Sequence, residues 1–148
     1  MKNITYIEDF AKWRNEFMFY IPIHVRFSET DMFGHVNNTS AFIYFEQARI
    51  EFFKDRGLFT NFNDPEINGV PVVADLQCDF HKQMYFDEKI KLYVKANSIG
   101  QTSIDLHYLA TNENDDVCLT GRGRIVYMNR HTGKPKPLTS DIKQKLMN

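Results

Sequence analysis

The stretch that decides the fold runs SETDMFGHVNNTSAFIYFEQARIEFFKDRG, over residues 28–57. Its first half is polar, with one glycine and two asparagines, which is typical of a loop that leads into a helix. From Ala41 to Arg56 no glycine or proline occurs, and Gly57 stands where a left-handed C-terminal residue belongs. We therefore predict a helix of about four turns over this run, with the side chain of Asn38 or Ser40 as its N-cap.

This helix is apolar on nearly its whole circumference. Aromatic and aliphatic residues recur on every side of it: Ala41, Phe42, Ile43, Tyr44, Phe45, Ala48, Ile50, Phe52 and Phe53. A helix with this distribution is generally buried. Other elements of the chain should therefore wrap it.

The segments on either side of the helix supply the strands. Period-2 alternation of apolar and polar residues predicts five of them, at 21–27, 70–80, 89–96, 104–110 and 117–128. Short connections make the last four antiparallel, and SDIKQKL near the end predicts a short helix capped by Ser140. One helix packed on an antiparallel sheet is an α+β architecture, and 148 residues fit a single domain over 1–148.

Composition excludes several classes of protein. The chain is 43% hydrophobic with a formal net charge of −1, which fits a globular protein and not a nucleic-acid binder. Charged residues such as Glu8 and Lys12 interrupt the N-terminus, so we expect no signal peptide, and no run approaches the roughly 18 apolar residues of a membrane span. Two widely separated cysteines fit a reducing compartment, so we expect a cytoplasmic protein that does not bind membranes.

Asp31 lies where chemistry is expected, between a strand and a helix. The first amides of a helix have no internal acceptors and carry a positive dipole end, so they can bind a polarised carbonyl. Gly34 lets the backbone approach a ligand closely. A carboxylate beside such a site can attack the carbonyl or activate water against it. The alternative interpretation is that Asp31 only shapes the turn with its side chain.

Residues 26–49 resemble the signature of hot-dog-fold thioesterases of the 4-hydroxybenzoyl-CoA thioesterase-like type. That signature is an aspartate, two residues, Gly-His-Val-Asn-Asn and then a helix with a glutamate and an arginine. A weaker resemblance extends over nearly the whole chain. It implies a hot-dog fold, in which a five-stranded antiparallel sheet wraps a long buried helix. It also implies a homodimer or homotetramer, with strand pairing between subunits and sites built between them.

The resemblance assigns roles to residues of the signature. It implies three catalytic residues, Asp31, His35 and Glu46, and it places Gly34, Val36, Asn37 and Asn38 against the substrate. Lys82 is a candidate for contact with the phosphates of coenzyme A, as are Arg122 and Arg124, although such residues are more often solvated charges. His35 is equally explained as a residue that shapes the loop, and Glu46 as an ion-pair partner of Arg49. Asn37 and Asn38 also fit a structural role, in which they hold the turn and the helix start.

The implied activity is hydrolysis of an acyl-CoA thioester to a free acid and coenzyme A, with acyl-ACP as an alternative carrier. No cofactor is expected beyond the coenzyme A of the substrate. The remaining histidines show no metal-ligand spacing, so we expect no metal site. Two other functions stay open, hydration of an enoyl thioester and acyl-CoA binding without catalysis.

Overall fold

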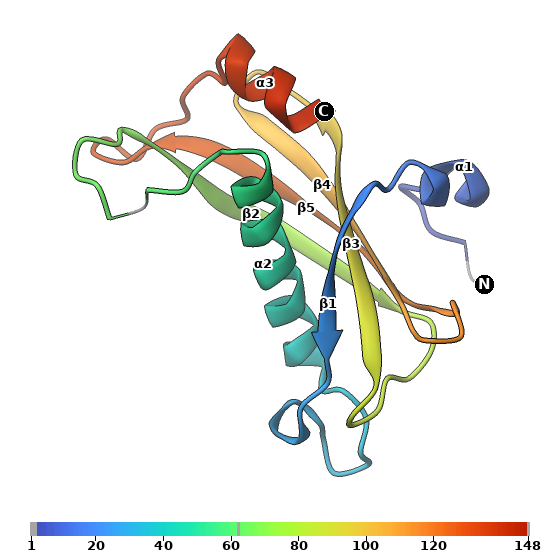
Figure 1. The fold of residues 1–148 in the computed structure, drawn as a ribbon. Coiled ribbons are helices and arrows are strands. Elements are labelled where there is room, and N and C mark those ends of the chain that lie inside the picture. The colour runs from blue at the N-terminus through green and yellow to red at the C-terminus, as the bar shows by residue number, and fades with distance from the viewer. Residues whose placement is uncertain (1–2, 62, 148) are drawn as a thin grey trace.

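The computed structural model describes residues 3–61 and 63–147 (Figure 1). Its elements in chain order are α1 (Phe10–Asn15), β1 (Phe19–His24), the 3-10 turn η1 (Phe27–Glu29), α2 (Asn38–Asp55), β2 (Gly69–Phe80), β3 (Lys89–Ile99), β4 (Ser103–Thr111), β5 (Val117–Asn129) and α3 (Ser140–Met147).

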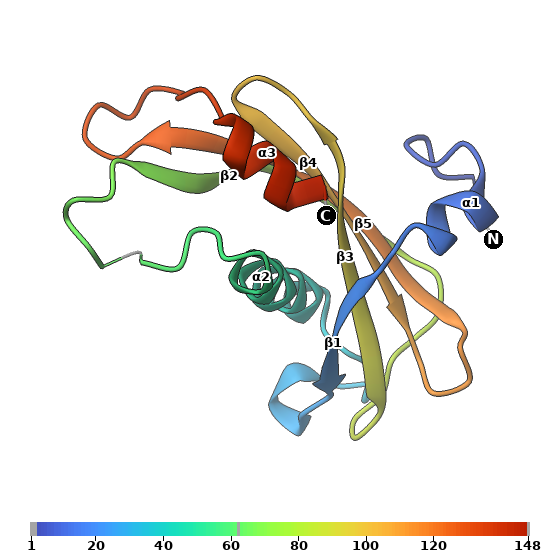
Figure 2. The ribbon, with the colours of Figure 1, turned by 45° about the horizontal axis from the view of Figure 1, so that its top comes forward.

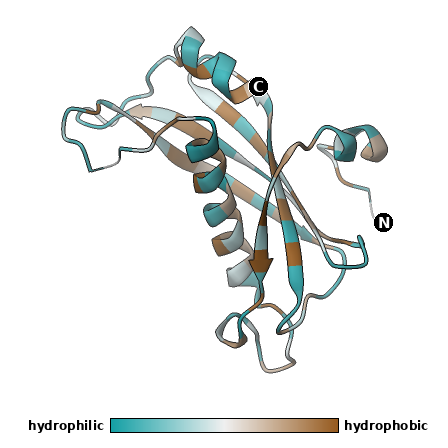
Figure 3. Ribbon diagram, viewed as in Figure 1, coloured by the Kyte–Doolittle hydropathy of each residue, from teal (hydrophilic) through white to brown (hydrophobic). Residues whose placement is uncertain are grey.

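The five strands form one antiparallel sheet in the order β1-β3-β4-β5-β2. α2 lies against one face of this sheet, while the N-terminal segment with α1 lies on the other side (Figure 2). The strands show alternating apolar and polar bands along their length (Figure 3). The predicted α+β hot-dog fold, with one long helix on a five-stranded antiparallel sheet, is confirmed.

The principal core lies between α2 and the sheet. Phe45 and Phe52 are buried, and the ring of Phe45 stacks on Tyr108 of β4 at a centroid distance of 4.4 Å. Burial does not extend all round the helix, however, because Ile43 is 59% exposed. A single sheet covers only one side of a helix, so the prediction of a helix wrapped on all sides was too strong for one chain.

The N-cap of α2 differs from the sequence-based prediction. Asn37, not Asn38 or Ser40, is the capping residue, and its Oδ1 accepts a hydrogen bond from the Thr39 amide at 3.1 Å. The helix begins earlier than predicted because Asn37 is the last extended residue before it. At α3 the cap is also one residue earlier, since Thr139 Oγ1 accepts from the Ile142 amide at 3.2 Å while Ser140 is already helical.

β1 ends before the predicted limit of residue 27. Phe27 belongs to η1 and is 75% exposed, although the alternation had placed it in line with Ile21 and Ile23. The reason is local: the Glu29 carboxylate accepts a hydrogen bond from the Arg26 amide at 2.8 Å, which turns the chain away from the sheet.

β2 is an edge strand, and its alternation is broken. A register shift occurs between Val73 and Asp75, and both Val72 and Val73 are more than a third exposed. Phe80, at the strand's end, is 49% exposed although it falls on an apolar position of the alternation. A bulge bends a strand and leaves a residue unpaired, so period 2 alone cannot assign its faces.

The N-terminal helix α1 had no counterpart in the sequence-based prediction. Asp9 caps it by accepting from the Lys12 amide at 3.2 Å, and its Trp13 is buried. Trp13 and Phe17 pack with Leu109 of β4, while the neighbouring Tyr108 faces α2. Successive strand residues point to opposite faces, so the sheet carries a second, smaller core on the face away from α2.

Candidate functional site

The segment between η1 and α2 forms a tight closed turn. The Asp31 amide donates to the His35 carbonyl at 2.7 Å, the Gly34 amide donates to the Asp31 carbonyl at 3.1 Å, and Thr30 and Val36 form a β-bridge. Gly34 has a φ of 79°, a left-handed conformation that glycine adopts without strain. The glycine of the signature is therefore required by the turn itself.

Asp31 directs its carboxylate across this turn. Its Oδ1 accepts hydrogen bonds from the Phe33 amide at 2.9 Å and the His35 amide at 3.1 Å. Its Oδ2 has no hydrogen-bond partner among residues 3–61 and 63–147, and the side chain is exposed. One oxygen thus shapes the turn, as the structural interpretation of Asp31 requires, while the other remains available to a ligand.

His35 is held by the aromatic residues around it. Its ring stacks on Phe33 at 6.1 Å and meets Tyr85 edge-on at 5.1 Å, and its backbone bridges to Tyr85. The next amide, of Val36, donates to the Met84 carbonyl at 2.7 Å. These contacts tie the turn to the connection between β2 and β3.

The first turn of α2 leaves one amide open. The Thr39 amide donates to the Asn37 side chain, the Ser40 amide to the Asn37 carbonyl, and the Asn37 amide to the Glu29 carbonyl. The Asn38 amide donates no hydrogen bond within the described part of the chain. An open amide at a helix start is the donor that a polarised carbonyl or oxyanion needs.

Glu29 anchors this helix start, and sequence reasoning missed it. Its Oε1 accepts from the Tyr44 hydroxyl at 2.9 Å, which links η1 to the second turn of α2. Burial alone would raise the pKa of Glu29, but hydrogen bonds from the Arg26 amide and from Tyr44 outweigh it and hold the pKa below its usual range. The only signal in the sequence was a glutamate three residues after an arginine, which is too common to interpret.

A cavity of about 450 Å³ brings most of the predicted site residues together. Its volume lies within the range of small-molecule sites. It is lined by Asp31, His35, Val36, Asn37, Asn38, Phe80, His81, Lys82, Gln83, Met84 and Leu119. The carboxylate of Asp31 and the open N-terminus of α2 therefore share one cavity.

The predicted basic residues are less available than the sequence suggested. The Lys82 ammonium lies 2.6 Å from Asp116 Oδ2, and this hydrogen bond raises the pKa of Lys82. It stays charged and exposed at the edge of the cavity. Arg122 is instead fully engaged by Asp105 and Asp75 on the opposite face of the sheet, so its predicted contact with coenzyme A phosphates is not supported.

Glu46 does not join Asp31 within one chain. It projects from α2 with its side chain 68% exposed, and its Oε2 lies 3.9 Å from the Arg49 guanidinium. Both residues line a second cavity of about 460 Å³, beside the edge strand β2, with Ile50, Phe53, Pro71, Val72, Val73 and Ile125. The ion pair that the sequence left open as an alternative is present.

Comparison with known proteins identifies the family. The profile of the thioesterase-like superfamily matches residues 25–146. This chain belongs to that superfamily. An uncharacterized protein of Bacillus subtilis (strain 168), YsmA, is 38% identical over 148 residues, covering 99% of this chain and 98% of the relative.

Two solved structures of thioesterases have the same fold as this chain. A predicted thioesterase from Bacillus stearothermophilus is 36% identical, with a TM-score of 0.76 over 86% of this chain and 92% of that one. A thioesterase from Thermus thermophilus, complexed with coenzyme A and zinc, is 26% identical, with a TM-score of 0.72 over 86% of this chain and 90% of that one. Membership of the superfamily supports thioester hydrolysis in general.

Membrane-spanning helices and metal clusters are both absent from the described ranges. Within residues 3–61 and 63–147, no helix has the length and apolar character needed to cross a membrane. No three histidine, cysteine, aspartate or glutamate side chains in the same ranges gather closely enough to hold a metal ion.

Proposed function

We propose that this protein hydrolyses acyl-CoA thioesters to a free acid and coenzyme A, with Asp31 as the catalytic carboxylate. The observation that carries the proposal is the shared cavity, which is lined both by Asp31, whose Oδ2 has no hydrogen-bond partner among the described residues, and by the first residues of the long helix α2. The Thermus thermophilus relative, complexed with coenzyme A, supports a CoA thioester as the substrate, and acyl-ACP is the alternative carrier.

The chemistry follows from the two halves of the site. The thioester carbonyl oxygen accepts a hydrogen bond from the Asn38 amide, and the helix dipole stabilises the negative charge that develops there. Asp31 either takes a proton from the attacking water or adds to the carbonyl carbon itself to form an anhydride that water then cleaves. In both routes the C–S bond breaks and coenzyme A leaves as a thiolate that is then protonated.

The remaining predicted residues have supporting roles in this proposal. His35 bounds the cavity beside Asp31, where it orients water or the acyl group. Val36 and Asn37 line the wall of the cavity, while Gly34, which is not among the lining residues, gives the neighbouring turn its left-handed conformation. Lys82, charged at the rim, attracts the phosphates of coenzyme A in competition with Asp116.

A second copy of the chain is part of the proposal. The outer edge of β2 pairs with no other strand of the described chain, and such edges invite pairing. Antiparallel pairing of two copies of β2 sets the Val72 end of one strand against the Phe80 end of the other. It therefore brings the cavity with Glu46 towards the partner's cavity with Asp31. We propose a homodimer, or a homotetramer built from two such dimers, in which Glu46 completes the site of the neighbouring subunit.

The location proposed for the protein is the cytoplasm. Cys78 is half-buried and Cys118 is buried, and they form no disulfide. Cysteines without a disulfide fit a reducing compartment.

A thiol-release assay tests the activity. Short, medium, long and aromatic acyl-CoAs are each mixed with the enzyme, and release of free coenzyme A from at least one of them is the expected result. Tight binding of every acyl-CoA without release would replace hydrolysis with acyl-CoA binding, and loss of enoyl absorbance without release would replace it with hydration.

Single turnover in H₂¹⁸O separates the two chemical routes. With enzyme in excess, direct attack by water puts the label into the acid product in the first turnover. If Asp31 attacks and water then opens the anhydride at the carboxyl carbon of Asp31, the product takes an unlabelled carboxylate oxygen and the label stays on Asp31. Mass spectrometry of the peptide detects that label, and its presence identifies the covalent route.

A mixing experiment tests the shared site. Inactive Asp31→Asn and Glu46→Ala subunits are combined in one heterodimer. One of its two sites then contains the intact Asp31 of the Glu46→Ala subunit and the intact Glu46 of the Asp31→Asn subunit. Recovery of about half of the activity per dimer supports a site made from two chains. A fully active monomer in sedimentation would contradict it.

A further inference from the structure

The N-terminal strap, defined as residues 3–17, covers the sheet on the face away from the candidate site. It lies before the segment that the superfamily profile matches. Ile4, Ile7, Trp13 and Phe17 of the strap are buried with Leu109 of β4 in the second core. Trp13 is the single tryptophan of the chain.

One buried hydrogen bond fixes Trp13 on the sheet. The indole Nε1–H donates to Nδ1 of His107 at 2.7 Å, and His107 is completely buried on β4. An indole N–H can only donate, so Nδ1 must present a lone pair. The hydrogen of the neutral ring is therefore on Nε2, which donates to Asp105 Oδ2 at 2.8 Å. The docked strap requires neutral His107.

Charged groups surround His107 from every neighbouring strand. In the sheet register it stands opposite Lys95 of β3 on one side and Arg122 of β5 on the other. From the strap itself, the ring of Tyr6 meets the imidazole edge-on at a centroid distance of 5.0 Å. His107 thus has a cation on each flank and an aromatic cover.

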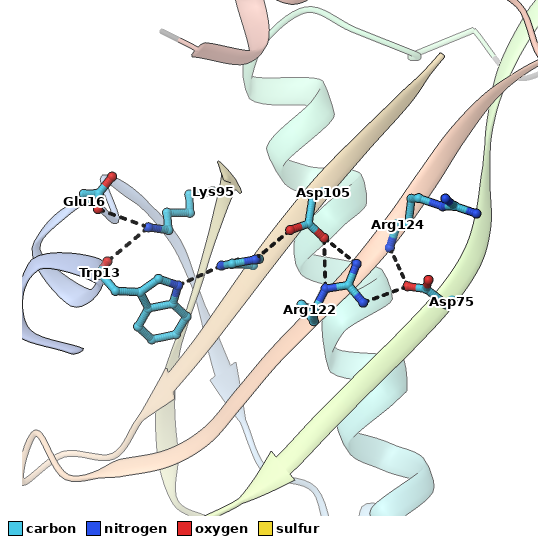
Figure 4. Close-up of polar contacts among 8 residues, drawn as sticks. Trp13, Glu16, Asp75, Lys95, Asp105, Arg122 and Arg124 are labelled. Atoms are coloured by element: carbon cyan, nitrogen blue, oxygen red, sulfur yellow. Dashed lines mark hydrogen bonds and ion pairs between the residues drawn. The ribbon is translucent and has the colours of Figure 1, made fainter. Parts of the chain in front are cut away.

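The neighbouring carboxylates are already engaged by other cations. Asp105 Oδ1 accepts from Nε and Nη2 of Arg122, at 3.0 and 2.6 Å, and the third nitrogen of that guanidinium reaches Asp75 of β2 at 3.1 Å. Lys95 donates to the Trp13 carbonyl at 3.2 Å and lies 3.7 Å from Glu16 (Figure 4). Within the described ranges, Asp105 is therefore the one carboxylate in direct contact with His107, and Arg122 shares it.

The carboxylate and the lysine of this network respond to burial in different ways. Burial would raise the pKa of Asp105, but hydrogen bonds from His107 and Arg122 outweigh it and hold the pKa below the usual carboxyl range. Burial lowers the pKa of Lys95, and Glu16 opposes this only in part. Asp105 thus stays ionised at any pH where histidines exchange protons.

We propose that the strap is a proton-sensitive latch, released from the sheet when His107 takes up a proton at Nδ1. The proton and the Trp13 indole compete for the same lone pair. Once Nδ1 is protonated, two N–H donors face each other across 2.7 Å, and a buried positive charge is added between Lys95 and Arg122. Because Nδ1 cannot bind the proton and the indole at the same time, lowering the pH must weaken the binding of the strap to the sheet.

The single tryptophan reports this directly. Fluorescence of the full-length protein is followed between pH 8 and pH 5, the range in which histidine side chains ordinarily exchange protons. The emission of Trp13 should shift to the red as its indole enters water, while far-UV circular dichroism shows that the sheet is intact. His107→Gln is the matched variant, because its amide carries an acceptor and a donor but takes up no proton in this range. It should keep the emission of a buried indole throughout.

Amide hydrogen exchange gives a second measurement on the unmodified chain. With intrinsic exchange rates divided out, opening of the strap around Trp13 should become about tenfold more frequent per pH unit as the pH falls towards the fluorescence transition, because one proton is linked to release. Amides of α2 should show no such slope. The proposal is overturned if the strap shows no slope, if the red shift comes only with loss of the sheet signal, or if His107→Gln shows the same transition as the wild type.

Discussion

A methyl group on Gly121 would lie 2.5 Å from Cε2 of Phe45, well inside van der Waals contact. The Phe45 ring therefore packs directly against the backbone of β5 at Gly121, and it stacks on the ring of Tyr108 at an interplanar angle of 9°. Only glycine permits this approach of α2 to the sheet. The position of α2 in turn fixes where its N-terminus lies in the cavity that Asp31 also lines.

Gly121→Ala should lower the free energy of unfolding by about 1 to 3 kcal/mol, because overpacking forces the helix or the strand to shift. Chemical denaturation followed by circular dichroism measures it. Gly100→Ala is the control, since a methyl group there lies 3.3 Å from the flexible Ser103 side chain on an exposed turn. Its effect should stay within about 0.5 kcal/mol. Equal effects at both positions would show that the Phe45 contact is not what requires glycine.

Tyr44→Phe should destabilise the protein by about 1 kcal/mol at neutral pH, because it removes the hydrogen bond to Glu29 and keeps the ring. The pKa of Glu29 is lowered in the folded state. Its contribution is therefore fully present above the carboxyl pKa of the unfolded chain and is lost as the pH falls through the lower folded value. In Tyr44→Phe this acid-dependent loss should be smaller. Unfolding midpoints measured between pH 7 and pH 3 for both proteins test the prediction.

The long helix and the strands could be predicted because their patterns are long and periodic. The run without glycine or proline before Gly57 predicted the end of α2 to within one residue, and the alternation at 89–96 and 104–110 located β3 and β4. Limits set by a single side-chain contact could not be predicted. β1 ends just before the Arg26 amide donates a hydrogen bond to the Glu29 carboxylate. The alternation of apolar and polar residues continues through Phe27, so it does not predict that bond.

The candidate site was only partly accessible from the sequence, for a related reason. Asp31, His35 and Asn38 are close in the chain, so the turn brings them together, and Lys82 reaches the same cavity because β2 ends beside it. Glu46 is on α2 beyond that turn and reaches a different cavity of the same chain. The N-terminal helix α1 is too short for periodicity to detect, and its buried Trp13 docks through His107, far away in the sequence.

The two adjacent asparagines should differ in their contribution to stability. Asn37→Ala removes the N-cap of α2 and should lower the free energy of unfolding by about 0.5 to 2 kcal/mol. Asn38→Ala, at the first helical position, should cost clearly less, although the Asn38 side chain also approaches the Thr39 amide at 3.0 Å. Thermal melting of the two variants compares them. A larger loss at Asn38 would reassign the cap to the residue that the sequence first suggested.

Cys118 should be inert towards thiol reagents in the folded protein. Burial raises the pKa of its thiol to about 11. At pH 8 only about one molecule in a thousand would then carry the reactive thiolate. In a Cys78→Ser variant, Ellman's reagent should label Cys118 only when the protein unfolds. The labelling rate should therefore rise by orders of magnitude in denaturant. Fast labelling of the native variant would show that β5 opens at this position.

Asp31→Asn is the decisive variant for the proposed activity. The asparagine keeps an acceptor oxygen for the Phe33 and His35 amides, so the turn should persist and the melting temperature should change little. It can neither attack a carbonyl nor take a proton from water, so kcat on the best acyl-CoA should fall on the order of 100-fold or more. Asp64→Asn is the matched control, because Asp64 Oδ1 also accepts an amide two residues on, from Glu66 at 2.9 Å, but lines no part of the candidate cavity. Its kcat should equal that of the wild type. If folded Asp31→Asn also retains most of its turnover, Asp31 only shapes the turn and another group must carry the hydrolysis.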